Sequence, residues 1–458
     1  MKEGHSSNAS KCWSLLSPVQ KQRAITLLAL TVTGTVLETL GIGFLIPALA
    51  VMTDADPAAR FPSLAPFLTA IGNPPREQLV VSGMVILVFV YVIKAAFLGF
   101  LAWRQSQFVY DVQSDVSHRL FSGYLRQPYT FHLQRNSAQL IRNAIGQAGG
   151  LSSLIQVAML LFSESLILAS LSILLLAVEP LGAILVGTIL ALSALTFSGL
   201  TRARVVRWGE AHQLHEAMRI QHIQQGLGSA KDLKLLGREE EFIAQYAIHN
   251  DGTAKVGALQ TALQSVPRLG LELLAAVGLA TLVLVMVSQH KPMDAILPTL
   301  GLFAAAAFRI MPSVSRILGA MHGIRYSLPV IETLYNEFGL FSPPPDPRQP
   351  AALECKKALH LKNVSFRYPS ATIDAVHDLS MTIDIGASIG IVGTSGAGKS
   401  TLIDLVLGLL PPRTGSIEID GSDIRMNLRS WQDRIGYVPQ SIYLTDDSVR
   451  RNVAFGLP

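Results

Sequence analysis

Six long apolar runs restrict the fold of this chain more than any other feature. They lie at 24–52, 79–103, 151–178, 181–200, 269–287 and 295–318. Each is about as long as the roughly 20 residues that a helix needs to cross about 30 Å of hydrocarbon. Of the 458 residues, 50% are hydrophobic and only 15% are charged. Buried helices of a soluble protein rarely stay almost free of charge over so many runs, so the sequence predicts six transmembrane helices.

Basic residues predict the orientation of these spans. The connection 104–150 carries five Lys or Arg and the connection 201–268 carries nine, whereas the opposite connections contain only Arg60, Arg76 and Lys291. Because Lys and Arg accumulate on the cytoplasmic side, we expect both termini and the two long connections in the cytoplasm. The net charge of +5 then reflects topology, and we expect no nucleic-acid partner.

The two ends of the membrane region have distinct characters. Residues 1–23 are polar and basic and lead into a span too long for the apolar core of a signal peptide, so we expect that span to be retained. The prolines of LFSPPPDPRQP, within 339–357, cannot continue a helix and predict a linker. Cys12 and Cys355 both fall on the predicted cytoplasmic side, where reduced thiols are expected.

Short apolar runs and turn signals replace the long runs after the linker. Alternating patterns at 359–368, 380–385 and 388–393 predict strands, and Asp420-Gly421 predicts a hairpin turn. We therefore expect four parts: a cytoplasmic segment 1–23, a transmembrane domain 24–338 with long cytoplasmic helical extensions, a linker 339–357, and an incomplete α/β domain 358–458.

A glycine-rich segment in the last part predicts a nucleotide site. Gly393–Ser400 reads GTSGAGKS and fits the pattern G-x-x-x-x-G-K-[ST]. It precedes KSTLIDLVLGLL, whose apolar spacing is helical, so backbone N–H groups at a helix N-terminus can cradle phosphate oxygens. Lys399 would supply charge to the β- and γ-phosphates, and the Ser400 hydroxyl would bind Mg²⁺. The alternative is a glycine turn without a ligand.

The six spans followed by this loop resemble one half of an ABC exporter, with a membrane domain and an ATP-binding domain on one chain. The resemblance implies a membrane all-α fold with six transmembrane helices, followed by a partial α/β P-loop NTPase domain, with ATP and Mg²⁺ as cofactors. It places Tyr368 of VSFRYPS against the adenine, and Gln440 of IGYVPQSIYL at Mg²⁺ and the attacking water. The implied cofactor contacts are Tyr368, Gly393, Thr394, Ser395, Gly396, Ala397, Gly398, Lys399, Ser400, Thr401 and Gln440, with Ser400 and Gln440 as the Mg²⁺ contacts.

The resemblance also implies partners and a location. Six spans and one ATP-binding domain make half a transporter, so we expect a second half-transporter, in the form of a homodimer, in the inner membrane. Gln127–Leu133 and Gly228–Gly237 resemble the coupling helices that dock on ATP-binding domains, and solvated loops are the alternative for both segments.

Basic residues within or beside the spans are candidates for substrate contacts, because charge inside a membrane is costly. Arg309 and Arg316 are seven residues apart and so share a helix face. With Lys94 and Arg268 they are expected to attract a phosphate or pyrophosphate head group. The alternative is that they snorkel to the cytoplasmic side or pair with the neighbouring carboxylates Glu38, Glu164 and Glu272.

Three stretches, LETLGIGFLIPAL, SVPRLGLELL and FRIMPSVSRI, resemble bacterial flippases for lipid-linked oligosaccharides. The resemblance implies an amphipathic substrate among the membrane lipids, with a lipid-linked oligosaccharide as the first expectation. A peptide or a drug-like amphiphile is the alternative.

The chain ends 58 residues after Ser400. In the family that it resembles, the LSGGQ signature, the catalytic Glu and a switch His come later in the ATP-binding domain, and none of them appears here. We therefore expect no catalytic residue in this sequence beyond the Gln440 contact, and no useful ATP hydrolysis by two copies of it. We interpret the chain as a truncated product of an active exporter, and a nucleotide-binding but non-hydrolysing membrane remnant is the alternative.

Overall fold

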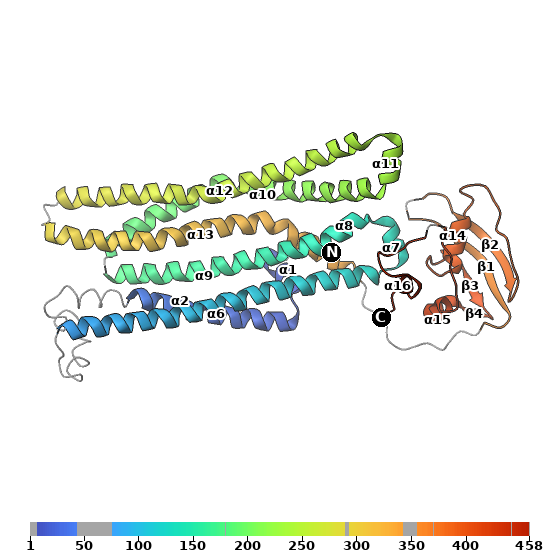
Figure 1. Cartoon of the computed structure of the whole chain (residues 1–458), viewed down its shortest axis with the longest axis horizontal. Helices are drawn as coiled ribbons and strands as arrows, with labels where there is room; N and C mark the ends of the chain where they lie inside the picture. The colour runs from blue at the N-terminus through green and yellow to red at the C-terminus, as the bar shows by residue number, and fades with distance from the viewer. Residues whose placement is uncertain are drawn as a thin grey trace. The chain divides into compact units, whose positions relative to one another are not determined.

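The structure is a computed structural model that describes residues 7–43, 76–178, 180–288, 293–341, 355–369, 371–440 and 442–457. It divides into two compact units (Figure 1). The first unit takes in residues 1–125 and 136–341, and the second takes in 126–135 and 342–458. Most of the expected linker, at 342–354, lies outside the described residues, so the expected domain bounds stay a prediction.

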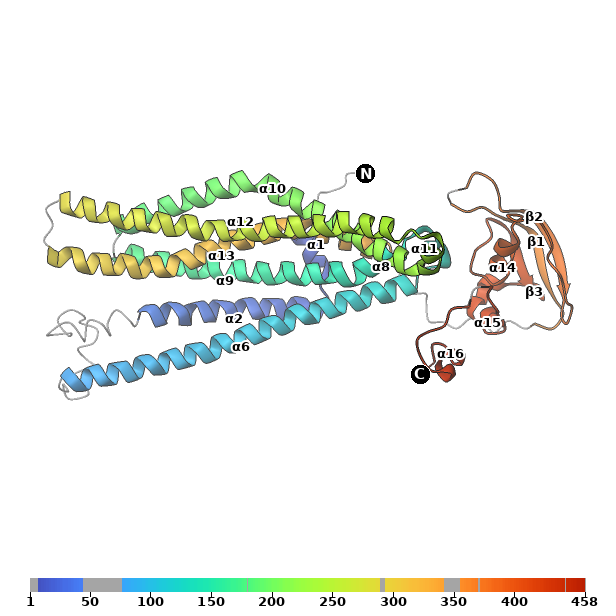
Figure 2. The same ribbon diagram turned by 45° about the horizontal axis from the view of Figure 1, so that its top comes forward.

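The first unit is helical throughout its described part. Its elements are α1 (Asn8–Leu15), α2 (Pro18–Gly43), α6 (Arg76–Leu125), α8 (Ser137–Arg142), the π-helix η2 (Asn143–Gln147), α9 (Ala148–Val178), α10 (Pro180–Gly228), α11 (Ala230–Leu236), α12 (Glu239–Ser288) and α13 (Met293–Gly339). The long helices lie side by side in both views (Figures 1 and 2). Within this bundle α9 packs on α13, and α10 packs on α12.

The longest helices exceed what a membrane requires. Helices α6 and α12 each contain 50 residues. At 1.5 Å per residue such a helix is about 75 Å long, against about 30 Å of hydrocarbon. Both helices therefore continue well beyond the predicted spans, and the cytoplasmic location of these extensions stays a prediction.

Three stretches among the described residues are long and apolar enough to cross a membrane: Pro18–Gly41, Val80–Leu125 and Ser137–Ile173. They contain most of the described parts of the first three predicted spans and leave out only 42–43, 79 and 174–178. Residues 44–52 of the first predicted span lie outside the described residues. The other three predicted spans lie within α10, α12 and α13, where many side chains are outside the description, so the number six stays a prediction.

The second unit contains a small antiparallel sheet. Its elements are α7 (Tyr129–Gln134), β1 (Ala358–Phe366), β2 (Val376–Asp384), α14 (Lys399–Val406), β3 (Thr414–Ile419), β4 (Ser422–Asp423), the 3-10 helix η3 (Ile424–Asn427), α15 (Leu428–Gln432) and α16 (Val449–Val453). The strand order is β2-β1-β3-β4. The strands predicted at 359–368 and 380–385 correspond to β1 and the end of β2, with small differences at their ends.

The predicted hairpin turn is also confirmed. Asp420 and Gly421 join β3 to β4 and have φ values of 48° and 89°. Two successive residues with positive φ match the tight turns that follow the twist of a hairpin.

The strand predicted at 388–393 is wrong, because this segment has no regular structure. Its apolar side chains are open to solvent, and Val392 is 95% exposed. A strand needs neighbouring backbone groups for its hydrogen bonds, and the described residues supply no strand that pairs with this segment. Residues 435–439 are irregular for the same reason, and Val438 is 87% exposed.

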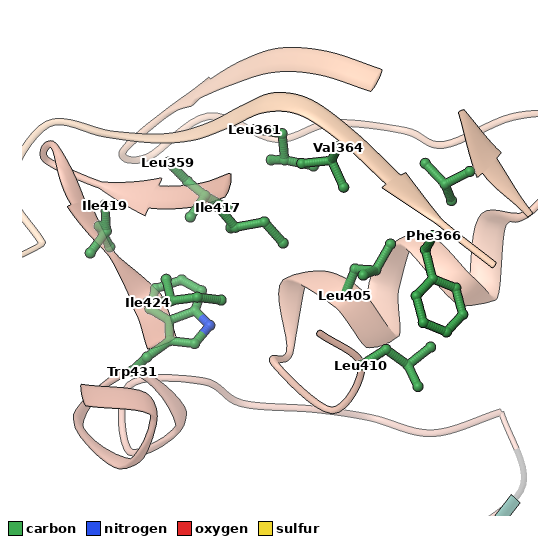
Figure 3. Packing of buried hydrophobic residues seen from close by; sticks show 11 residues of the cluster. Leu359, Leu361, Val364, Phe366, Leu405, Leu410, Ile417, Ile419, Ile424 and Trp431 are labelled. Atoms are coloured by element: carbon green, nitrogen blue, oxygen red, sulfur yellow. The ribbon is translucent and has the colours of Figure 1, made fainter. Parts of the chain in front are cut away.

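A compact apolar core holds the sheet and α14 together (Figure 3). It consists of Leu359, Leu361, Val364, Phe366, Val376, Leu405, Leu410, Ile417, Ile419, Ile424 and Trp431. Trp431 also donates its indole N–H to the carbonyl oxygen of Val406 at 2.7 Å. This bond satisfies the polar atom of a buried aromatic residue and ties α15 to the end of α14.

Candidate functional site

The glycine-rich loop leads directly into α14. Gly396 and Gly398 have φ values of 84° and 83°. A Cβ on Gly398 would lie 2.2 Å from the carbonyl oxygen of Ala375, so neither the backbone conformation nor the space accommodates a side chain. The loop therefore curves close to the residue before β2 and enters α14 with Gly398 as the residue preceding the helix.

Lys399 closes the loop upon itself. Its Nζ donates to the carbonyl oxygens of Gly393 and Thr394, at 2.8 and 2.7 Å. Lys399 is the first residue of α14, and its ammonium group folds back over the loop that precedes the helix. A cation held in this position is suited to meet an anion that occupies the loop.

The start of α14 fits a bound phosphate group. The first N–H groups of a helix have no partner within it and carry partial positive charge. Ser400 is exposed in this first turn, whereas Thr401 and Leu405 are buried beneath it. With glycine at 396 and 398, the backbone can approach phosphate oxygens closely, and Ser400 would offer its hydroxyl to Mg²⁺. Mg²⁺ would neutralise charge on the phosphates.

The structure brings Tyr368 next to this turn. The Tyr368 hydroxyl lies 3.1 Å from Oγ1 of Thr401, and its ring packs edge-on against Phe366 with 5.0 Å between ring centres. Gln440 is exposed in an irregular segment. The adenine contact of Tyr368 and the Mg²⁺ contact of Gln440 stay predictions.

Asp374 supports the loop in a way that the sequence analysis missed. Its carboxylate accepts hydrogen bonds from Arg367 at 2.7 Å and from Arg413 at 3.3 Å. The hydrogen bond from Arg367, followed by one from His377, lowers the pKa of Asp374. These contacts fix the residue next to Ala375, whose carbonyl faces Gly398. No motif marks Asp374: Arg367 and His377 are near it in sequence, but Arg413 is 39 residues away and Ala375 meets Gly398 only in the folded domain.

The candidate substrate residues do not form one cluster in the described contacts. Lys94 Nζ lies 3.9 Å from Oε1 of Glu38, and Arg268 Nε lies 2.9 Å from Oε1 of Glu272. These pairs correspond to the alternative reading, in which the cations pair with neighbouring carboxylates. The Arg309 side chain lies outside the described residues.

Arg316 forms a closer pair with a buried carboxylate. Its Nη1 lies 2.6 Å from Oε1 of Glu164, and the side chains are 56% and 5% exposed. Glu164 lies on α9 and Arg316 on α13, so the pair joins two packed helices. The buried carboxylate of Glu164 thus anchors Arg316, while over half of the Arg316 side chain stays exposed.

Both segments predicted to couple the domains contain short helices. Helix α7 overlaps Gln127–Leu133, and α11 lies within Gly228–Gly237. Gly237 ends α11 with a φ of 64°, as is typical of a glycine after a helix. Their docking role stays a prediction.

Comparison with protein families agrees with both units. The model of the ABC transporter transmembrane region matches residues 25–291, which is more than half of the chain, and the model of the ABC transporter ATP-binding domain matches residues 376–454. The chain belongs to the ABC transporter family. It is a multi-pass membrane protein with an ATP-binding domain.

Individual relatives are more distant. The chain is 25% identical over 366 residues to an ATP-dependent lipid A-core flippase of Alkalilimnicola ehrlichii, covering 76% of this chain and 59% of that relative. It is 39% identical over 137 residues to a mitochondrial iron-sulfur clusters transporter of Neurospora crassa, covering 29% and 19%. The solved structure of a bacterial Atm1-family ABC exporter with ATP bound shares the fold, with a TM-score of 0.71 and 18% identity, covering 96% of this chain and 75% of that one. The chain thus spans less than two thirds of the first relative.

Proposed function

We propose that this ABC transporter chain provides the membrane domain and the phosphate loop of an ATP-driven flippase. The observation that carries the proposal is the loop from Gly393 to Ser400, which is anchored on the core through α14 and lies on the same chain as long apolar helices. The loop would bind ATP with Mg²⁺, and the membrane domain would move an amphipathic lipid across the inner membrane.

The proposed substrate is a lipid with a phosphorylated glycan head, and a lipid-linked oligosaccharide is the first candidate. The name of the lipid A-core flippase supports this class at modest identity. Arg316 is the described cation best suited to contact a phosphate, because Glu164 anchors it while over half of its side chain stays exposed. Family membership supports a second copy of the chain as the partner.

The exposed apolar segments favour a second candidate function. Val392 and Val438 lie in irregular segments on either side of the nucleotide loop in sequence. An ATP-binding domain with these segments unpaired would hold its catalytic groups poorly. On this reading the chain binds nucleotide but does not hydrolyse it at a useful rate.

A binding experiment tests the nucleotide site. The chain in lipid nanodiscs is titrated with a fluorescent ATP analogue and Mg²⁺. A hydrogen bond to a charged group contributes about 1.5–3 kcal/mol, so Lys399→Ala is expected to weaken binding at least about tenfold. Lys357→Ala changes an exposed lysine of the same domain and should bind normally. If the two variants bind the ATP analogue with equal affinity, the loop is not the nucleotide site.

ATP turnover in the same nanodiscs separates the two candidates. Turnover comparable with that of a complete ABC exporter supports the flippase reading for this chain and contradicts the binding-only one. Binding without turnover supports the second candidate.

A flipping assay tests the substrate contact in a background that shows transport. Arg309→Ala and Arg316→Ala are compared with Arg204→Ala, which removes an exposed arginine outside the predicted spans. With a polyprenyl-pyrophosphate oligosaccharide as the probe, the first two variants should slow flipping. If both flip at the normal rate, the cationic contact is wrong.

A further inference from the structure

Three histidines gather between α10 and α12 of the first unit, and none of them is among the residues proposed to contact nucleotide or substrate. His215 and His222 are seven residues apart on α10 and so share one face, and His249 lies opposite them on α12. The ring centres of His215 and His249 are 5.3 Å apart, and those of His222 and His249 are 5.4 Å apart. This histidine cluster lies in the connection 201–268, which is predicted to be cytoplasmic, on the two helices that α11 joins.

The nitrogens within the cluster face one another. Nδ1 of His215 lies 3.1 Å from Nδ1 of His249. Only one proton can occupy the space between them, because two N–H donors would oppose each other. Neutral imidazole is the form that binds metal ions.

His222, the third histidine of the cluster, has one ring nitrogen without a hydrogen-bond partner. Nδ1 of His222 is buried and has no hydrogen-bond partner. Its ring stacks on His249 at an interplanar angle of 20°. A rotation of this side chain would break no hydrogen bond at Nδ1.

The spacing suits a tetrahedral ion. Imidazole nitrogens bound at about 2.0–2.1 Å lie about 3.3 Å apart around such an ion, with ring centres about 5 Å apart. The observed nitrogen pair and the separation of the His215 and His249 rings are close to these values. Among the described residues no three His, Cys, Asp or Glu side chains already converge as a complete site, so His222 must turn to complete it.

Charged neighbours leave room for a cation. Arg219, on the α10 turn between His215 and His222, pairs with Glu216 at 2.9 Å. His212, one turn earlier, packs against Tyr326 of α13 instead of joining the cluster. The nearest arginine on this part of α10 is therefore neutralised by its own carboxylate partner.

We propose that His215, His222 and His249 bind one divalent transition-metal ion of the zinc class. Imidazole ligands suit such ions, whereas Mg²⁺ and Ca²⁺ prefer oxygen. The ion would clip α10 to α12 and stiffen the hairpin that carries α11. The site is independent of the proposed flippase activity and of nucleotide binding.

Zinc binding to the purified chain, without a histidine tag, tests the proposal. The chain in nanodiscs is titrated with Zn²⁺ alone against a competing fluorescent chelator. We expect a single saturable site, and replacement of a ligand in His215→Ala or His249→Ala should weaken binding at least about tenfold. His118→Ala removes an exposed histidine of α6 and should leave the affinity unchanged.

Further measurements keep the outcome unambiguous. Co²⁺ in place of Zn²⁺ should give the visible absorption of a tetrahedral complex, which His222→Ala should change. His249→Gln preserves the size and polarity of the side chain, so loss of zinc in this variant with unchanged circular dichroism supports the site. Equal zinc affinity in the wild type and the His215→Ala/His249→Ala double variant would overturn the proposal. If the chain takes up no zinc, and protonation of the histidines alone separates α10 from α12, the proposal is also overturned.

Discussion

At the residue scale, Gly398 shows how one missing side chain shapes the candidate nucleotide site. It combines a φ of 83° with the close approach of the Ala375 carbonyl. Asp374, held by two arginines, keeps that carbonyl in place. The loop geometry thus depends on residues that precede β2, more than 20 positions earlier in the chain.

We predict that Gly398→Ala impairs both the ATP-binding domain and the loop. The left-handed backbone alone costs an L-residue about 1–2 kcal/mol, and the clash with Ala375 adds to this. Thermal unfolding should start at a lower temperature, and the affinity for the ATP analogue should fall. Gly390→Ala is the matched control, since a Cβ there meets nothing within 4 Å. Equal behaviour of the two variants would contradict the role given to Gly398.

Asp420 gives a pH-dependent prediction. Its carboxylate accepts the backbone N–H groups of Lys356, Ala358 and Lys357, and these bonds lower its pKa. The resulting stability is present above the unfolded pKa of about 3.9 and is lost as the pH falls through the lower folded pKa.

In Asp420→Asn, asparagine can adopt the backbone φ of 48° but does not carry the carboxylate charge. We expect the variant to be less stable than the wild type at neutral pH and to converge with it in acid. Thermal unfolding across this pH range measures both. A constant difference at every pH would show that the carboxylate charge is not involved.

At the scale of elements, α14 links the loop to the core. Its apolar face buries Leu405 completely against the sheet residues shown in Figure 3. The helical spacing of KSTLIDLVLGLL predicted this helix, and the alternating pattern predicted β1. Both predictions succeeded because the apolar residues of α14 and β1 pack into one core, and β1 pairs with β2 and β3 within the described domain.

We predict that Leu405→Ala destabilises the ATP-binding domain by about 2–5 kcal/mol, as a cavity in a packed core typically does. Chemical unfolding followed by fluorescence of Trp431, with the other tryptophans replaced, measures the change. Met426→Ala removes an exposed side chain of η3 and should alter stability by less than about 0.5 kcal/mol. Similar values for both variants would contradict the assigned core.

The segment 388–393 shows where pattern reading fails. Its alternation is strand-like, yet a strand exists only when neighbours complete its hydrogen bonds. Likewise, the sequence left open whether Lys94 and Arg316 gather or pair, and only the packing of the helices decided that each lies beside a carboxylate of another helix. Arg268 and Glu272 are four residues apart on α12, so their pairing is local.

At the scale of the whole molecule, length and charge predict topology. The long helices extend beyond the hydrocarbon, and the basic connections predict that both termini are cytoplasmic. This orientation is open to direct measurement because the sequence contains only two cysteines.

We predict that Cys355 reacts with a membrane-impermeant maleimide only from the cytoplasmic face. The experiment uses Cys12→Ser, so that a single partly exposed thiol remains. Inside-out vesicles should label and right-side-out vesicles should not. A cysteine introduced at Lys291, in a predicted outer connection, should label in the opposite manner. Labelling of Cys355 in right-side-out vesicles would contradict the predicted topology.

The sequence by itself determined the helical membrane domain, the phosphate loop and the hairpin at Asp420-Gly421. The backbone hydrogen bonds of a helix form within the helix, and a tight turn depends on a few adjacent residues. Both can therefore be predicted from a short stretch of sequence. Only the tertiary structure decided the support of Gly398 by Asp374, the pairing of Arg316 with Glu164 and the histidine cluster. These contacts join residues far apart in sequence, and no local pattern records which helix or strand becomes the neighbour.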